Sequence, residues 1–138
     1  MLNKVILLSL FLGKPVYAKE VCGVGQIKYI KNQKEIVQNL KFCKESEGGS
    51  IYSQNCSERK CHFLKEPFKR PVDLRKYAST MGSPGFKVCR ELKGSPQIIK
   101  YKFNDQKFWD DDARCIVDEK TFVSNSILLE MWKDYILN

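Results

Sequence analysis

Six cysteines constrain the fold of this chain more than any other feature of its sequence. All of them follow residue 18, at Cys22, Cys43, Cys56, Cys61, Cys89 and Cys115. An even number of cysteines in a small exported protein predicts a disulfide framework. Each bridge contributes about 2–4 kcal/mol, mostly by restricting the unfolded chain. We therefore expect three bridges that together are comparable with the stability of a typical domain.

Zinc binding is the alternative role for these cysteines. A structural zinc site combines two pairs of closely spaced ligands. Only Cys56, Cys61 and His62 approach that spacing, and the sequence has no second such pair. It also has no Cys-x-x-Cys motif, which excludes the simplest thiol oxidoreductases. We therefore expect no bound metal and no cofactor.

The first 18 residues have the three parts of a secretory signal. Lys4 precedes an apolar run over residues 5–12, and the small residues Val16 and Ala18 precede a cleavage site after Ala18. The run is much shorter than the about 20 residues that cross a membrane. Removing 18 of the 138 residues leaves 120 and lowers the formal charge from +8 to +6. We expect a soluble, secreted or periplasmic protein with no transmembrane segment after cleavage.

Two segments share one order of residue types: apolar, Cys, basic, Glu, two further residues, then Gly. They are residues 42–48 and 88–94. A glycine in the left-handed conformation commonly closes a helix, so both segments predict a helix end, at Gly48 and at Gly94. The chain thus has either two similar halves or two helix ends whose sequences resemble each other by chance.

Apolar spacing predicts a helix before each of these glycines. Between residues 36 and 43, apolar residues recur at steps of three and four. Before the second glycine, Ser83 can cap a helix, Pro84 suits its first turn, and apolar residues follow every third position.

Strand patterns follow the second helix. Residues 97–103 alternate between apolar and polar, and residues 115–117 and 121–123 flank a polar turn as in a hairpin. A final helix over residues 127–136 carries one apolar face. Together these elements predict an α+β fold, with helices packed on short antiparallel sheets or hairpins.

The order of elements also suggests how the cysteines pair. A helix followed by a sheet favours a bridge between Cys89 and Cys115. By analogy, Cys43 would pair with Cys56 or Cys61, and Cys22 with the remaining one. The predicted organisation is a signal at 1–18, a Cys-rich half at 19–66, a connector at 67–83 and a helix–sheet–helix half at 84–138.

Part of the chain resembles a known bacterial family. Residues 82–89, Gly94, residues 115–120 and Trp132 resemble a family of small exported domains of unknown function, sometimes given a hemolysin label. The resemblance covers residues 82–132. Lys120-Thr121-Phe122 stands where the family usually has a second Cys, and Asp118-Glu119 replaces its Asp-Gly. The resemblance implies an exported helix-plus-sheet module and brings no established activity.

Residues suited to catalysis are few. His62 is the only histidine, and its place in an apparent strand over residues 61–64 turns it toward water. The acidic run Asp110–Asp112, with Asp105, could suit a hydrolase or calcium. It lacks the alternating spacing of a calcium loop, however, and consecutive side chains splay apart, so we interpret it as a solvated loop. These patterns favour a protein that is not an enzyme.

One segment holds nearly all of the excess positive charge. Residues 59–76 contain seven basic and two acidic residues, interleaved with aromatic ones. Such a segment is typical of polyanion binding. The basic residues are Arg59, Lys60, Lys65, Lys69, Arg70, Arg75 and Lys76.

The leading functional hypothesis is an exported, non-enzymatic binding or structural module. Its partner would be an anionic envelope polymer or a protein, not genomic nucleic acid. The alternative is a secreted effector, such as a hydrolase inhibitor or a toxin, that presents the constrained loop of residues 57–60 between Cys56 and Cys61.

Overall fold

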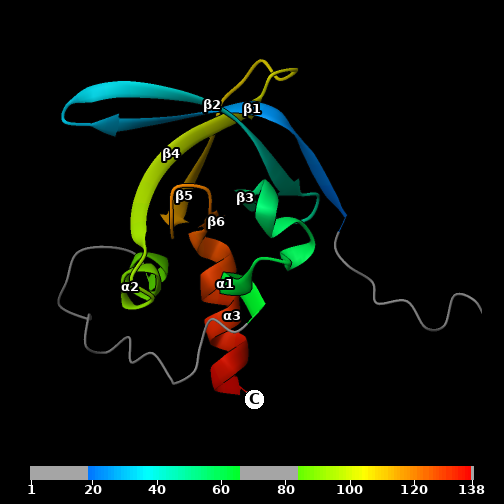
Figure 1. The fold of residues 1–138 in the computed structure, drawn as a ribbon, viewed down its shortest axis with the longest axis vertical. Helices are drawn as coiled ribbons and strands as arrows, with labels where there is room; N and C mark the ends of the chain where they lie inside the picture. Colours follow the sequence, from blue (N-terminus) through cyan, green and yellow to red (C-terminus); the bar gives the residue numbers. More distant parts are fainter. Residues whose placement is uncertain (1–18, 66–83, 138) are drawn as a thin grey trace, which may run out of the picture.

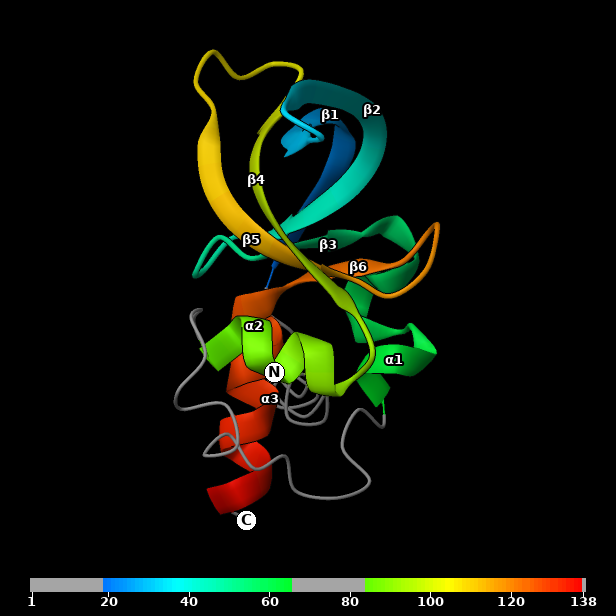
Figure 2. The same ribbon diagram turned by 90° about the vertical axis from the view of Figure 1, so that its left-hand side faces the viewer.

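The structure, a computed structural model, describes residues 19–65 and 84–137. These residues form a closed six-stranded antiparallel β-barrel with helices gathered at one side of it (Figures 1 and 2). The predicted signal, residues 1–18, and the predicted connector, residues 67–83, lie outside the described residues.

The elements alternate from strands to helices and back along the chain. The strands are β1 (Glu20–Lys31), β2 (Lys34–Glu45), β3 (Ile51–Ser53), β4 (Ser95–Phe103), β5 (Asp110–Ile116) and β6 (Phe122–Ser124). The helical segments are the 3-10 segment η1 (Gln54–Arg59) and the helices α1 (His62–Lys65), α2 (Pro84–Glu91) and α3 (Asn125–Leu137).

The strand order around the barrel follows a Greek key. β1, β2 and β3 pair in succession, and β4 then lies beside β1, which gives the spatial order 4-1-2-3. β5 and β6 continue from β4, and β6 closes the barrel against β3 through the pair Tyr52 and Val123. Each predicted half therefore contributes three neighbouring strands to one sheet.

The long hairpin of β1 and β2 replaces the first predicted helix. Its two turn residues, Asn32 and Gln33, have positive φ angles of 52° and 65°, as the tightest hairpin turns require. The helix predicted over residues 36–43 is therefore wrong. The apolar positions there fit a period of two as well, because Leu40 and Phe42 both pack inside the barrel.

Two separate clusters form the core. One fills the barrel and contains Ile27, Phe42, Ile51, Ile99, Tyr101, Phe103 and Phe122. The other lies between the outer face of the barrel and the helices and contains Cys43, Tyr52, Cys56, Cys61, Leu64, Val88, Cys89, Cys115, Val123, Ile127 and Leu128. β3 and β6 therefore contribute to both clusters.

One end of the barrel is filled by aromatic rings. Phe42 stacks on Phe103 with 4.6 Å between ring centroids, and Tyr101 meets Phe42 edge-on at 6.0 Å. Gly25 makes room for this group, because a Cβ atom there would lie 2.5 Å from the Phe42 ring. The opposite end, near the turn of the β1–β2 hairpin, is the open mouth of the barrel.

The element predictions for the C-terminal half are confirmed. The predicted helix is α2, the strand over residues 97–103 lies within β4, β5 and β6 form the predicted hairpin, and the helix over residues 127–136 lies within α3. One detail is wrong. The residue with left-handed backbone after α2 is Lys93, at φ 67°, and not Gly94.

The three expected disulfides are present, but only one predicted pairing is right. The bridges join Cys22 to Cys43, Cys56 to Cys61, and Cys89 to Cys115. The expected pairing of Cys43 with Cys56 or Cys61 is wrong because Cys22 and Cys43 lie directly opposite each other in the β1–β2 ladder. That error follows from the helix expected in place of β2.

The predicted α+β fold is wrong as well. The six strands form one sheet closed on itself, and the helices cover only part of its outer face. The repeated order of residue types has a different structure in each segment. Residues 42–48 end a strand and enter a turn, whereas residues 88–94 end a helix.

Candidate functional site

The structure describes residues 59–65 of the predicted basic segment, and acidic neighbours largely neutralise the positive charge there. The Arg59 guanidinium lies 3.2 Å from the Glu45 carboxylate and 3.7 Å from that of Glu130. The Lys60 ammonium lies 3.0 Å from the Glu58 carboxylate. Polyanion binding by this segment therefore stays a prediction. Of the other residues predicted for it, Lys65 is exposed, and Lys69, Arg70, Arg75 and Lys76 lie outside the described residues.

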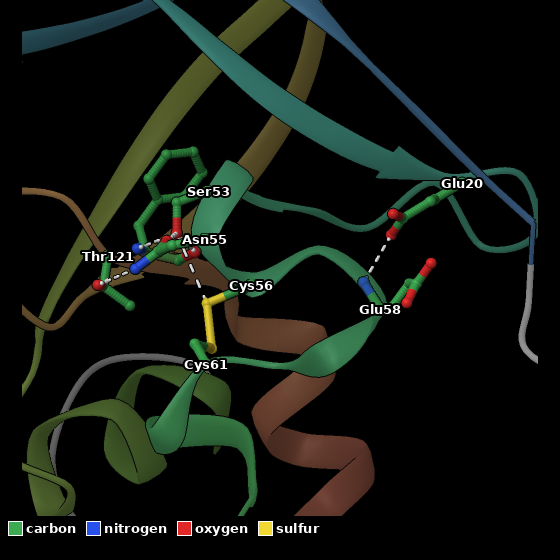
Figure 3. Close-up of a disulfide and its surroundings, with 8 residues drawn as sticks. Glu20, Ser53, Asn55, Cys56, Glu58, Cys61 and Thr121 are labelled. Atoms are coloured by element: carbon green, nitrogen blue, oxygen red, sulfur yellow. Dashed lines mark hydrogen bonds between the residues drawn. A yellow bond between two sulfur atoms is a disulfide. The ribbon is translucent and has the colours of Figure 1, made fainter.

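The loop between Cys56 and Cys61, which the inhibitor hypothesis would present, is fixed in place (Figure 3). Glu58 and Arg59 both have left-handed backbone, at φ 54° and 56°, which costs residues of this kind about 1 kcal/mol or more each. The Glu58 N–H donates a hydrogen bond of 3.1 Å to the Glu20 carboxylate. With Arg59 also ion-paired, the loop presents no free arginine.

The Glu20 carboxylate connects the start of β1 to this loop. It accepts hydrogen bonds from the hydroxyls of Tyr52 and Ser57 as well as from the Glu58 N–H. Burial alone would raise the pKa of Glu20, but these hydrogen bonds outweigh it and leave the pKa below its ordinary value. Burial and the contact with Glu20 raise the pKa of the Tyr52 hydroxyl, which keeps it a donor.

Cysteines lie beside other candidate metal ligands at two places in the described residues, and neither place offers a metal site in the oxidised protein. The Glu20 carboxylate and the sulfurs of Cys22 and Cys43 lie within 4.8 Å of one another, but both sulfurs belong to a disulfide. Cys61 is likewise bonded, so it cannot act with His62 as a thiolate ligand. His62 begins helix α1, so the strand predicted there is wrong, while its predicted exposure to water is confirmed.

The acidic run begins strand β5, so its interpretation as a solvated loop is wrong. Asp110 and Asp111 are exposed and form ion pairs with Lys44 of β2 and Lys100 of β4, respectively. Asp112 is half-buried and accepts hydrogen bonds from the Ser124 hydroxyl at 2.5 Å and from the Ala113 N–H at 2.7 Å. Burial raises the pKa of Asp112 above its ordinary value. The three carboxylates thus have separate partners and do not form a facing pair.

The open mouth of the barrel holds a cavity of about 940 Å³. Residues of all six strands and of the β5–β6 turn line it, and Tyr29, Leu40, Ile116 and Phe122 supply apolar wall. Cavities of several hundred cubic ångströms with apolar walls and a few polar groups are typical of small-molecule binding sites.

Hydrogen bonds hold one wall of this mouth in place (Figure 3). The Ser53 hydroxyl donates to the Phe122 carbonyl at 3.2 Å and accepts from the Phe122 N–H at 3.1 Å. The Asn55 side-chain amide donates to the Thr121 hydroxyl at 2.7 Å. These bonds attach the end of β3 to the start of β6, and the start of η1 to the β5–β6 turn, so this wall is largely preformed.

Arg114 is the central polar group of the cavity. It projects inward from β5 and is only 4% exposed. Its Nε donates to Gln97 Oε1 at 2.9 Å, and its Nη2 lies 3.5 Å from Gln38 Oε1. The guanidinium carbon lies 4.8 Å from the ring centroid of Phe122 and 5.5 Å from that of Tyr29. Neutral amide oxygens and aromatic faces therefore surround the charge.

The charge of Arg114 is not balanced by a carboxylate within residues 19–65 and 84–137. No salt bridge to Arg114 forms among them. Asp112, two residues away on β5, instead accepts hydrogen bonds from the Ser124 hydroxyl and the Ala113 N–H. Burial lowers the pKa of Arg114 to about 10. The guanidinium therefore stays protonated at neutral pH, as a buried cation beside an open cavity.

The sequence patterns did not single out Arg114 as a functional residue. The available signal was its position: Arg114 stands between Ala113 and Cys115, directly before the apolar strand residues of the predicted hairpin. A strand that begins at Asp110 places Asp112, Arg114 and Ile116 on one face. Only the barrel shows that this face is the interior.

Comparison with protein-family models, with curated proteins and with solved structures gives no match. The resemblance of residues 82–132 to a family of exported domains therefore stays a prediction. Any functional assignment depends on the geometry of the barrel mouth and on the chemistry of its residues.

Proposed function

We propose that this chain is an exported binding protein that holds a small organic molecule in the mouth of its barrel. The observation that carries the proposal is the buried, protonated Arg114 beside a cavity of about 940 Å³ with apolar walls. Burying a charge without an ionic partner costs stability, so such groups are more common at functional sites than in passive cores.

Export is supported by the bridges and by the composition of the N-terminal residues. All six cysteines are bonded in three disulfides, which persist in oxidising compartments. No helix in the described ranges is long and apolar enough to cross a membrane. These findings fit a secreted or periplasmic protein, and the pattern over residues 1–18 is that of an export signal.

A neutral fluorescent probe tests the proposal. The full chain, produced with export so that its disulfides form, is titrated with phenyl naphthylamine, whose emission rises in apolar surroundings. We expect saturable binding of one probe per chain that is lost in Ser95→Trp, because Ser95 lines the mouth. Ile98→Trp, on the same strand but 73% exposed, is the matched control and should bind like the parent. Absence of binding, or equal binding by the two variants, would refute the proposal.

A further inference from the structure

The environment of Arg114 also indicates which class of molecule the mouth accepts. The geometry points to an organic acid with a single negative charge and an apolar or aromatic body, whose acid group binds the guanidinium of Arg114. This inference rests on the proposed function, because it assumes that the cavity is a binding site.

The guanidinium of Arg114 has more hydrogen-bond donors than the described residues engage. A guanidinium has five N–H donors. Within the described residues, Gln97 engages the Nε donor and Gln38 approaches one donor of Nη2. The two donors of Nη1 and the second of Nη2 have no such partner among them. Donors of a charged group that adjoin a cavity are available to a ligand oxygen, and carboxylates and sulfonates match them well.

Neighbouring side chains hold the guanidinium of Arg114 in one orientation. Gln97 lies directly opposite Arg114 in the β4–β5 ladder, so its amide oxygen is a fixed neutral acceptor. The rings of Tyr29 and Phe122 confine the group further. A preformed donor set of this kind spares a ligand part of the ordering cost of binding. Because both acceptors are neutral amides, the protein orients the cation without cancelling its charge.

The mouth can balance only a small negative charge on a ligand. The rim carries Lys31, Lys41 and Lys120 against Asp118 and Glu119, all of them exposed. The rim thus has one net positive charge, and water screens it. Arg114 is the buried basic residue of the cavity lining. One buried cation favours one anionic charge, and a multiply charged phosphate would bring charge that the interior does not balance.

The remainder of the ligand would meet apolar side chains. Apolar walls from Leu40, Ile116 and the two aromatic rings surround the approach to Arg114. Burying apolar area there is favourable at roughly 25 cal/mol per Å². A molecule that pairs an acid group with an apolar or aromatic body satisfies both the buried charge and these walls, whereas a purely polar anion satisfies only the charge.

The decisive comparison uses two probes that differ by one acid group. Anilinonaphthalene sulfonate carries the anion, and phenyl naphthylamine has almost the same body without it. We expect the full oxidised chain to bind the sulfonate about tenfold more tightly or better. In Gln97→Glu a carboxylate stands where the amide oxygen now contacts Arg114, so this preference should vanish while the affinity for the neutral probe is retained.

Gln106→Glu provides the matched control. It adds the same charge in the β4–β5 loop, at the far end of the barrel, and it keeps the acceptor for the Phe103 N–H. It should bind both probes like the parent chain. If Gln97→Glu fails to fold, Gln38→Glu places the carboxylate on the second acceptor and tests the same point.

The outcomes separate the two proposals. Failure of the neutral probe to bind removes the proposed function. Binding of both probes with equal affinity by the parent chain, or a sulfonate preference that survives in Gln97→Glu, leaves the cavity as a binding site and overturns the inferred ligand class. Displacement of the bound sulfonate by naphthoate should be at least as effective as by naphthyl phosphate; stronger displacement by the phosphate would contradict the single-charge argument.

Discussion

Gly94 lies so close to the Cys89–Cys115 bridge that a Cβ atom added to it would stand 2.3 Å from the Cys115 sulfur. The same atom would lie 3.1 Å from the Cys89 sulfur. The glycine after α2 is therefore required because the disulfide occupies the volume of a side chain, while Lys93 makes the left-handed turn.

This contact predicts that Gly94→Ala destabilises the oxidised protein by about 1–3 kcal/mol, because a buried methyl group must displace a disulfide and nearby backbone. Urea unfolding of the oxidised chain measures the change. Gly23→Ala is the control: its added Cβ would meet the Phe103 ring at 3.7 Å, an ordinary contact, and should alter stability by no more than about 0.5 kcal/mol. Equal midpoints for both variants would contradict the packing argument.

The three disulfides should differ in how readily they are reduced. Cys22 is exposed, whereas Cys56, Cys61, Cys89 and Cys115 are all buried. A thiolate must reach a sulfur atom to cleave a bridge, so mild reductant should open Cys22–Cys43 first. Stepwise reduction followed by alkylation and peptide mapping should find label on Cys22 and Cys43 before the others. Early label on Cys89 or Cys115 would show that the second core cluster opens more easily than its burial implies.

The C-terminal half was predictable because its local signals agree with its tertiary packing. Pro84 marks the first turn of α2, and the alternation over residues 97–103 continues into the buried Ile99, Tyr101 and Phe103 of β4. When turn chemistry and hydrophobic period point to one structure, sequence is a sufficient guide.

The N-terminal half was mispredicted because its signals are ambiguous. The apolar residues at 36, 40 and 43 fit a helical period, while those at 36, 40 and 42 lie on one face of a strand. The turn at Asn32 and Gln33 also lacks the usual glycine. The outer face of β2 adds to the confusion, since Cys43 is buried by the helices outside the barrel. The spacing of apolar residues alone cannot show that a second layer of structure covers the other face of a strand.

The candidate site could not be predicted from local pattern at all. Arg114 acquires its properties from Gln38 on β2, Gln97 on β4 and the rings of Tyr29 and Phe122, which come together only when the barrel closes. The predicted basic segment, in contrast, is a property of composition. Its described member Arg59 is neutralised by residues 14 and 71 positions away in the sequence, Glu45 and Glu130.

The lowered pKa of Glu20 predicts a pH-dependent contribution to stability. Because the folded state holds the carboxylate ionised, this contribution is present above the unfolded pKa of about 4.5 and is lost as the pH falls through the lower folded value. We expect Glu20→Gln to lower the urea midpoint at neutral pH, and this deficit should shrink as the pH falls below the unfolded pKa and through the lower folded value, because the carboxylate of the parent chain then becomes protonated as well.

The control for this prediction is Glu47→Gln, an exposed substitution in the turn between β2 and β3. It should leave the urea midpoint nearly unchanged across the same pH range. A deficit of Glu20→Gln that stays constant from neutral pH to acid would mean that the carboxylate acts through shape alone, and not through its charge.

Replacing Arg114 should separate binding from stability. Arg114→Met keeps a long side chain in the barrel and removes a buried charge that no carboxylate balances among the described residues, so the melting temperature should stay the same or rise. The same variant should lose its preference for an anionic probe, because only the guanidinium supplies it. Arg90→Met removes an equal charge from the surface of α2 and should alter neither property. A large drop in melting temperature for Arg114→Met alone would mean that Arg114 is retained to hold Gln38, Gln97 and the barrel wall together, and that the mouth has no need of an anion.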